Sequence, residues 1–150
     1  MEPDAEALSA AAAVLLEQEI RRRPDLLLCA AAGSSPRRAY RRLAQMAARE
    51  PGVFDRWRVL KLDEWGGLPM DHPATCEVDL RDNLLGPANV AMERFQTIQS
   101  DAVDPKRECD RVAQWLVRHG PIDVCVLGLG TNGHLAMNEP DDALEPHAHV

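Results

Sequence analysis

Short apolar segments alternate with helical patterns along most of this 150-residue chain, and this alternation constrains the fold more than any other feature. Residues 25–31, 58–62 and 122–127 are short and rich in apolar side chains, as expected of strands covered on both faces of a sheet. Residues 94–99 are a weaker candidate for a further strand. Strands that alternate with helices in this way predict an α/β fold with a doubly wound, mainly parallel, Rossmann-like sheet.

Helices are predicted between these strands from periodicity and from signals at their ends. Residues 5–22 carry apolar side chains at helical spacing, and Pro24 ends the pattern. Gly33 to Pro36 provide a tight turn, a capping hydroxyl and a proline for the first helical turn, which predicts a helix over residues 37–49. Two further helices are predicted, over residues 74–85 and 104–119.

Composition excludes several classes of protein. The formal net charge of -7 argues against a general nucleic-acid surface but leaves room for a local basic pocket that binds a phosphate. The four cysteines form no Cys-x-x-Cys pair, so free thiols are expected, and His147 and His149 have no matching partners for a metal. The N-terminal segment lacks the features of a secretory signal, and no apolar run reaches membrane-spanning length. These observations predict a cytoplasmic protein without a metal site or a membrane partner.

Polar residues follow three of the predicted strands directly. Because the carboxyl ends of parallel strands meet at one edge of a sheet, we expect the three groups to surround one ligand. Their convergence is more informative than any one of them alone. The groups are Gly33-Ser34-Ser35, Asp63-Glu64-Trp65 and Gly130 to His134.

Two of these groups have both a functional and an ordinary interpretation. The Gly33 to Ser35 segment, at a helix start, offers backbone N–H groups, hydroxyls and the positive end of the helix dipole to a phosphate, or it is a simple N-cap. Asp63 is either a general base at the end of a strand or, like Glu64, a solvated loop carboxylate. Arg37, in the following helix, belongs to a solvated face or faces an anion.

The third group contains a histidine with amide and carboxylate neighbours. His134 is either a turn residue satisfied by the backbone or a proton shuttle that Asn132 or Glu139 holds in one tautomer. The glycine-rich loop before His134 and the carboxylate shortly after it favour the shuttle.

These segments resemble the amino-sugar phosphate deaminase/isomerase family, which includes glucosamine-6-phosphate and galactosamine-6-phosphate deaminases. The Asn-Glu-Pro motif distinguishes this family from the related 6-phosphogluconolactonases, which keep a Gly-His loop but usually lack that motif. The resemblance runs from the first predicted strand onward. The matching segments are Lys61-Leu62-Asp63-Glu64-Trp65, Leu68-Pro69, Gly128-Leu129-Gly130-Thr131-Asn132-Gly133-His134-Leu135 and Asn138-Glu139-Pro140.

The resemblance implies a cofactor-free conversion of an amino-sugar phosphate into a ketose 6-phosphate and ammonia. It implies that Asp63 moves a proton between C2 and C1 and that His134, tuned by Glu139, opens the sugar ring. It also places the phosphate on Gly33, Ser34 and Ser35. Galactosamine-6-phosphate-type members share the asparagine and the tryptophan found here at Asn132 and Trp65, whereas glucosamine-6-phosphate enzymes usually have aspartate in place of the asparagine.

Members of the family normally continue for roughly another half-length, with further strands and with basic residues that bind the phosphate. The resemblance therefore implies that residues 1–150 are the N-terminal part of a single sugar-phosphate isomerase domain, with a sheet incomplete at its C-terminal part. An uncovered sheet edge would favour a homo-oligomer or aggregation. Two other functions stay open: a 6-phosphogluconolactonase-like hydrolase, and a non-catalytic sugar-phosphate sensor domain.

Overall fold

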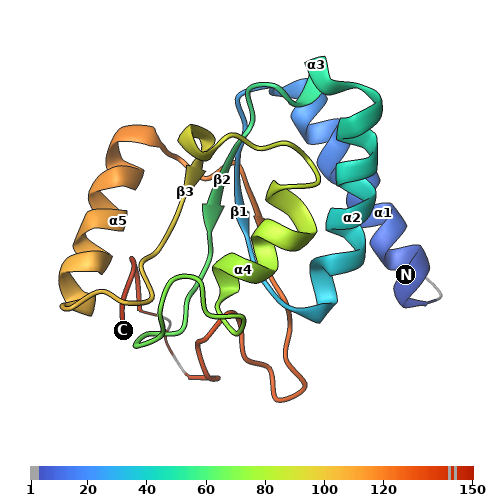
Figure 1. Cartoon of the computed structure of the whole chain (residues 1–150). Helices are drawn as coiled ribbons and strands as arrows, with labels where there is room; N and C mark the ends of the chain where they lie inside the picture. The colour runs from blue at the N-terminus through green and yellow to red at the C-terminus, as the bar shows by residue number, and fades with distance from the viewer. Residues whose placement is uncertain (1–3, 142, 144) are drawn as a thin grey trace.

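A parallel sheet lies at the centre of the computed structural model, which describes residues 4–141, 143 and 145–150. Its strands follow the order β3-β2-β1-β4, and each neighbouring pair is parallel (Figure 1). The sheet and its flanking helices confirm the predicted α/β class. The strands are β1 (Leu27–Ala30), β2 (Arg58–Lys61), β3 (Phe95–Gln96) and β4 (Val124–Val126).

The helices largely follow the sequence signals. Asp4 caps α1 by accepting a hydrogen bond from the Ala7 N–H at 2.8 Å, and Asp104 caps α5 in the same way. The predicted helix over residues 74–85 divides into the short helix α4 and a π-helical turn, η1. The elements are α1 (Ala5–Arg22), α2 (Ser34–Arg49), α3 (Pro51–Phe54), α4 (Cys76–Leu80), η1 (Arg81–Leu85), the 3-10 turn η2 (Met92–Arg94) and α5 (Pro105–His119).

The start of α2 differs from the prediction in one respect. The helix begins at Ser34, and its N-cap residue is Gly33, which has a φ of 103° and no side chain to cap the helix. The predicted capping hydroxyl is therefore wrong. The left-handed backbone at Gly33 explains why glycine stands there, because other residues adopt this conformation only with strain.

Successive residues of the strands point into different cores on the two faces of the sheet. Leu28 and Ala30 pack with α1, α2 and α4, whereas Leu27 and Cys29 pack with Val112 of α5. Figure 1 shows α5 on one side of the sheet and α1, α2 and α4 on the other. Coverage on both faces explains why the β1 segment is apolar at every position.

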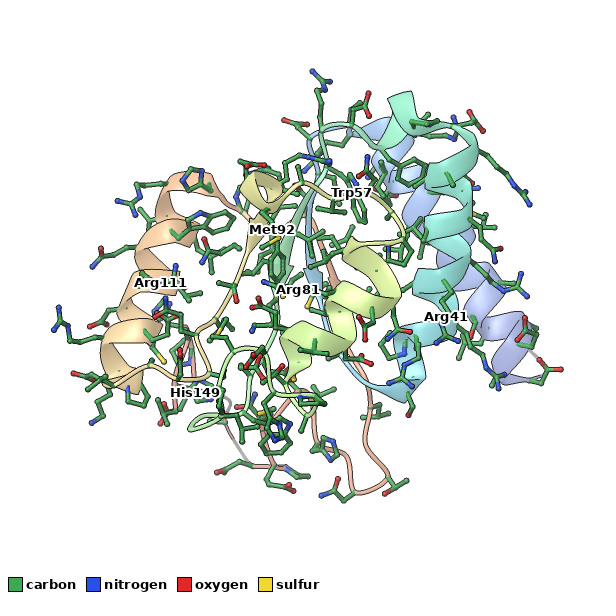
Figure 2. All side chains as sticks on the ribbon, viewed as in Figure 1. Arg41, Trp57, Arg81, Met92, Arg111 and His149 are labelled. Atoms are coloured by element: carbon green, nitrogen blue, oxygen red, sulfur yellow. The ribbon has the colours of Figure 1, made fainter. Side chains whose placement is uncertain are left out.

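Trp57 closes the larger core at the end of the sheet where β2 begins. Its side chain is fully buried and packs edge to face on Phe54, with ring centroids 6.0 Å apart (Figure 2). By contrast, β4 lies at the edge of the sheet, and its Cys125 is exposed. No helix within the described ranges is long and apolar enough to cross a membrane.

Candidate active site

A cavity of about 750 Å³ lies at the carboxyl ends of β1, β2 and β4. Four of the seven predicted catalytic and phosphate-binding residues line it: Gly33, Asp63, His134 and Glu139. Ser34, Ser35 and Asn132 are not among the residues that line it. The remaining wall comes from the segments that follow β1, β2 and β4, from α2 and from the start of α4. The other lining residues are Ala32, Arg37, Trp65, Pro73, Ala74, Thr75, Cys76, Asp79, Ala136 and Met137.

Asp63 is a partly buried carboxylate placed by the end of β2. Burial raises its pKa above the ordinary value, and the neighbouring negative charge of Glu64 adds to this rise. The Cys76 thiol and Lys61 oppose the rise without cancelling it. A carboxylate with a raised pKa is a stronger base than an aspartate in water, which suits abstraction of a proton from carbon.

The Cys76 thiol beside Asp63 is a protonated donor. Burial first, and then the Asp63 and Glu64 carboxylates, raise the pKa of Cys76 to about 12. Cys76 is the first residue of α4, and its side chain is almost completely buried. The thiol therefore contributes a hydrogen bond to Asp63 and not a nucleophile.

Asn132 links His134 to Glu139. The Asn132 Oδ1 lies 2.7 Å from Nδ1 of His134, and the Asn132 Nδ2 donates to Oε2 of Glu139 at 2.7 Å. Because a carboxylate only accepts, the amide must turn its NH₂ group toward Glu139 and its oxygen toward the imidazole. Nδ1 of His134 then carries the proton, which leaves Nε2 of a neutral imidazole free to accept one.

A tight turn holds this loop in place. The Gly130 N–H donates to the His134 carbonyl at 2.9 Å, and the Gly133 N–H donates to the Gly130 carbonyl at 2.9 Å. Gly133 has a φ of 93°, a conformation that glycine adopts without strain. Gly133 thus serves the turn, and Asn132 provides the amide contact to His134.

The predicted phosphate-binding segment is already hydrogen-bonded to a carboxylate, that of Asp79. Asp79 of α4 accepts a hydrogen bond from the Gly33 N–H at 2.8 Å and from the Arg37 guanidinium at 2.5 Å. Arg37 lines the cavity, and its Nε is buried without a hydrogen-bond partner. The positive N-terminal end of α2 therefore has the Asp79 carboxylate beside it. The Arg37 guanidinium, which lines the cavity, is available to a bound phosphate.

Several residues of this site have no signal in the sequence. Asp79, Thr75 and Cys76 reach the cavity only because α4 packs over the end of β2, and neither spacing nor motif predicts that arrangement. For Arg37, the sequence left two interpretations open: a side chain on a solvated helix face, or one that faces an anion. Trp65, one of the residues that carry the family resemblance, lies at the edge of the cavity and is 57% exposed.

Within the described part of the chain, no group of three or more histidine, cysteine, aspartate or glutamate side chains could hold a metal ion. His149 contacts the Asn138 Oδ1 through Nε2 at 2.7 Å and the His147 carbonyl through Nδ1 at 3.0 Å. Local hydrogen bonds thus account for His149.

Comparisons with known proteins agree on one family. The profile of the family of glucosamine-6-phosphate isomerases and 6-phosphogluconolactonases matches residues 3–141. Glucosamine-6-phosphate deaminase 1 of Giardia intestinalis is 35% identical over 117 residues, which are 78% of this chain and 44% of that protein. Glucosamine-6-phosphate deaminase of Streptomyces avermitilis is 33% identical over 117 residues, which are 78% of this chain and 45% of that protein.

Solved structures give the same result. A monomeric glucosamine-6-phosphate deaminase superposes with a TM-score of 0.87 at 31% identity, over 93% of this chain and 58% of that one. The 6-phosphogluconolactonase of Thermotoga maritima has a TM-score of 0.73 at 15% identity, over 89% of this chain and 59% of that one, and shares the fold. The chain spans about half the length of the curated relatives that it matches. It belongs to the family of glucosamine-6-phosphate isomerases and 6-phosphogluconolactonases.

Proposed function

We propose that the cavity is the active site of an amino-sugar phosphate deaminase/isomerase. This enzyme would convert a 2-amino-2-deoxyhexose 6-phosphate and water into a ketose 6-phosphate and ammonia. The observation that carries the proposal is that Asp63 and His134 line one cavity, with Asn132 and Glu139 orienting the imidazole. The similarity to glucosamine-6-phosphate deaminases of Giardia intestinalis and Streptomyces avermitilis supports the same reaction.

His134 opens the sugar ring in this proposal. With Nδ1–H held by Asn132, the Nε2 lone pair takes the proton of the anomeric hydroxyl and returns it to the ring oxygen as the C1–O5 bond breaks. The products of this step are the open-chain aldehyde and a neutral imidazole. Glu139 acts through Asn132 and is a positioning residue.

Asp63 then moves a proton between neighbouring carbons. Its carboxylate removes the C2 proton of the open-chain amino aldose and returns a proton to C1, while a second proton passes from the amine nitrogen to O1, which gives an imine at C2 by way of an enolamine. Water adds to this imine, and the C–N bond breaks to release ammonia and leave the ketone. Partial burial makes Asp63 more basic for this task.

The substrate that we favour is galactosamine 6-phosphate, which would yield tagatose 6-phosphate. Asn132 and Trp65 support this choice, because both residue types resemble galactosamine-6-phosphate-type members of the family. Trp65 lies at the edge of the cavity, where its exposed indole can contact a sugar. Glucosamine 6-phosphate is the comparison substrate.

The test measures release of ammonia and formation of ketose phosphate from both sugars. The assay uses the 150-residue chain and, separately, the full product of its gene, and Asp63→Asn serves as the inactive control. We expect the wild-type protein to turn over galactosamine 6-phosphate faster than glucosamine 6-phosphate. Asp63→Asn should turn over neither sugar.

Two results would contradict the proposal. Hydrolysis of 6-phosphogluconolactone without ammonia chemistry would identify a lactone hydrolase. Thermal stabilisation by an amino-sugar phosphate without any turnover of the full gene product would identify a sensor domain.

A further inference from the structure

The carboxylate that follows Asp63 in the chain is buried beneath the cavity wall. The Glu64 side chain is 2% exposed, and it forms an ion pair with the fully buried ammonium of Lys61 at 2.5 Å. Burial opposes the charge on Glu64, but Lys61 and backbone N–H groups outweigh it and hold the pKa of Glu64 below the ordinary value. Glu64 is therefore ionised, and it is not the solvated loop carboxylate that the sequence alone suggested.

Each oxygen of Glu64 accepts two hydrogen bonds. Oε1 accepts from the Trp65 N–H at 2.9 Å and from the Cys76 N–H at 2.8 Å. Oε2 accepts from the Glu77 N–H at 3.1 Å and from the Lys61 ammonium at 2.5 Å. One side chain thus joins the last residue of β2, the loop after it and the first turn of α4.

Glu77 completes the cluster from the side of α4. It lies 3.2 Å from the Lys61 ammonium, accepts a hydrogen bond from the Thr97 hydroxyl and pairs with Arg81 at 2.6 Å. Figure 2 shows Arg81 on the segment that carries α4 and η1. Lys61 consequently has two carboxylates for one positive charge, and both link β2 to α4.

We infer that Glu64 is a positioning residue, which fixes Asp63 relative to the adjacent part of the cavity wall, formed by Trp65 and Cys76. Asp63 precedes Glu64 directly, and the thiol that hydrogen-bonds to Asp63 belongs to the residue whose N–H Glu64 accepts. A displacement of about 1 Å in such a pair is enough to slow catalysis substantially. The catalytic consequence rests on the proposed function, whereas the structural one does not.

The charge of Glu64 also acts on Asp63. The charged groups that act most strongly on Asp63 are Glu64, which raises its pKa, and Lys61 at the end of β2, which lowers it. The other ionisable groups near Asp63 are Cys76 on α4, Cys29 on β1, Cys125 on β4 and Tyr40 on α2, and Arg37, Asp79, His134 and Glu139 line the same cavity. Loss of the Glu64 charge should therefore lower the pKa of Asp63 for two reasons. The Asp63 carboxylate would no longer be repelled by Glu64, and Glu64 would no longer neutralise part of the positive charge of Lys61.

The matched control is Glu108 on α5, which lies on the other face of the sheet. Its carboxylate is also buried, accepts the Gln99 N–H at 2.7 Å and pairs with Arg111 at 2.5 Å. Removing it breaks the same kinds of contact without touching the wall of the site. The pairs to compare are Glu64→Asp with Glu108→Asp, and Glu64→Gln with Glu108→Gln.

The first measurement is amide hydrogen exchange in the 150-residue chain. Glu64→Asp keeps the charge but shortens the side chain, so exchange at the Trp65, Cys76 and Glu77 amides should accelerate roughly tenfold or more. Glu108→Asp should leave these amides unchanged. Unchanged protection in a folded Glu64→Asp chain would overturn the inference, and this variant serves if Glu64→Gln does not fold.

The second measurement is the pKa of Asp63 by carboxyl ¹³C NMR, with turnover followed in parallel. Glu64→Gln should lower that pKa and shift the acid limb of the pH profile to lower pH, with kcat reduced roughly tenfold to hundredfold and KM changed much less. An Asp63 pKa equal to that of the wild type would overturn the inference. Absence of turnover in the wild-type full gene product would count against the proposed function alone, since exchange and titration do not depend on activity.

Discussion

The imidazole of His134 lies in the space that a β-carbon on Gly130 would occupy. A β-carbon built on Gly130 would be 2.2 Å from both Nδ1 and Cε1 of His134, far closer than side chains approach one another. The φ of Gly130 is not in the left-handed region, so the requirement for glycine comes from this contact and not from backbone conformation. The imidazole can pack against the backbone of its own loop only because residue 130 has no side chain.

Gly130→Ala should therefore displace the imidazole and reduce turnover roughly a hundredfold. The loop is exposed and lies outside both cores, so the thermal midpoint should change little. Kinetics and thermal melts of the variant check both expectations. Gly128→Ala is the control, because a β-carbon there meets no atom within 4 Å, and equal activity of the two variants would contradict the role given to His134.

Asp63→Asn should separate activity from stability. The raised pKa of Asp63 means that folding favours its protonated form, so the stability that this group contributes is present at low pH and is lost as pH rises through the raised pKa. At pH 7 the variant, which carries no charge there, should be at least as stable as the wild type while being inactive. Denaturant unfolding at several pH values measures this difference.

The difference in stability should shrink as pH falls and disappear below about 4, the ordinary pKa of aspartate, because Asp63 is then protonated in both the folded and the unfolded wild type. In the wild type, activity should fall with decreasing pH at a value above that ordinary pKa, because protonated Asp63 cannot act as a base. A variant that is clearly less stable at pH 7 would show instead that the charged form of Asp63 supports the fold.

Sequence patterns were sufficient for the sheet and for the edge where the site lies. The apolar segments, the helical spacing of apolar side chains and the stop at Pro24 are local signals, and local signals predict elements well. The contacts that shape the cavity are not local. Asp79 meets Gly33 across 46 residues of chain, and Glu64 is buried because α4 begins over the end of β2. The spacing of residues along the chain predicts neither the Asp79–Gly33 contact nor the burial of Glu64.

Asn132→Ala should release the imidazole from its single tautomer. In the wild type, the Asn132 oxygen accepts from Nδ1–H, whereas the variant should show a mixture of Nδ1–H and Nε2–H forms in ¹⁵N spectra of His134. Turnover should fall roughly tenfold or more, because Nε2 would already carry a proton in some of the molecules and could not accept one from the substrate. Asn138→Ala is the control, since Asn138 contacts Leu135 and His149 but not His134. An unchanged tautomer in Asn132→Ala would remove the positioning role of the amide.

Asp79→Asn should strengthen the binding of phosphate at the start of α2. The Asp79 carboxylate now accepts the Gly33 N–H and pairs with Arg37, so a phosphate at this place meets a negative charge and competes for the same donors. Removing that charge should raise the affinity for inorganic phosphate roughly three- to tenfold, with a smaller gain at high salt. Titrations that follow the Gly33 and Ser34 amides by NMR measure the effect. The exposed Asp82 on η1 provides the control Asp82→Asn, which should leave the affinity nearly unchanged. Weaker binding by Asp79→Asn would reverse the interpretation, because Asp79 would then serve the phosphate by holding Arg37 in position.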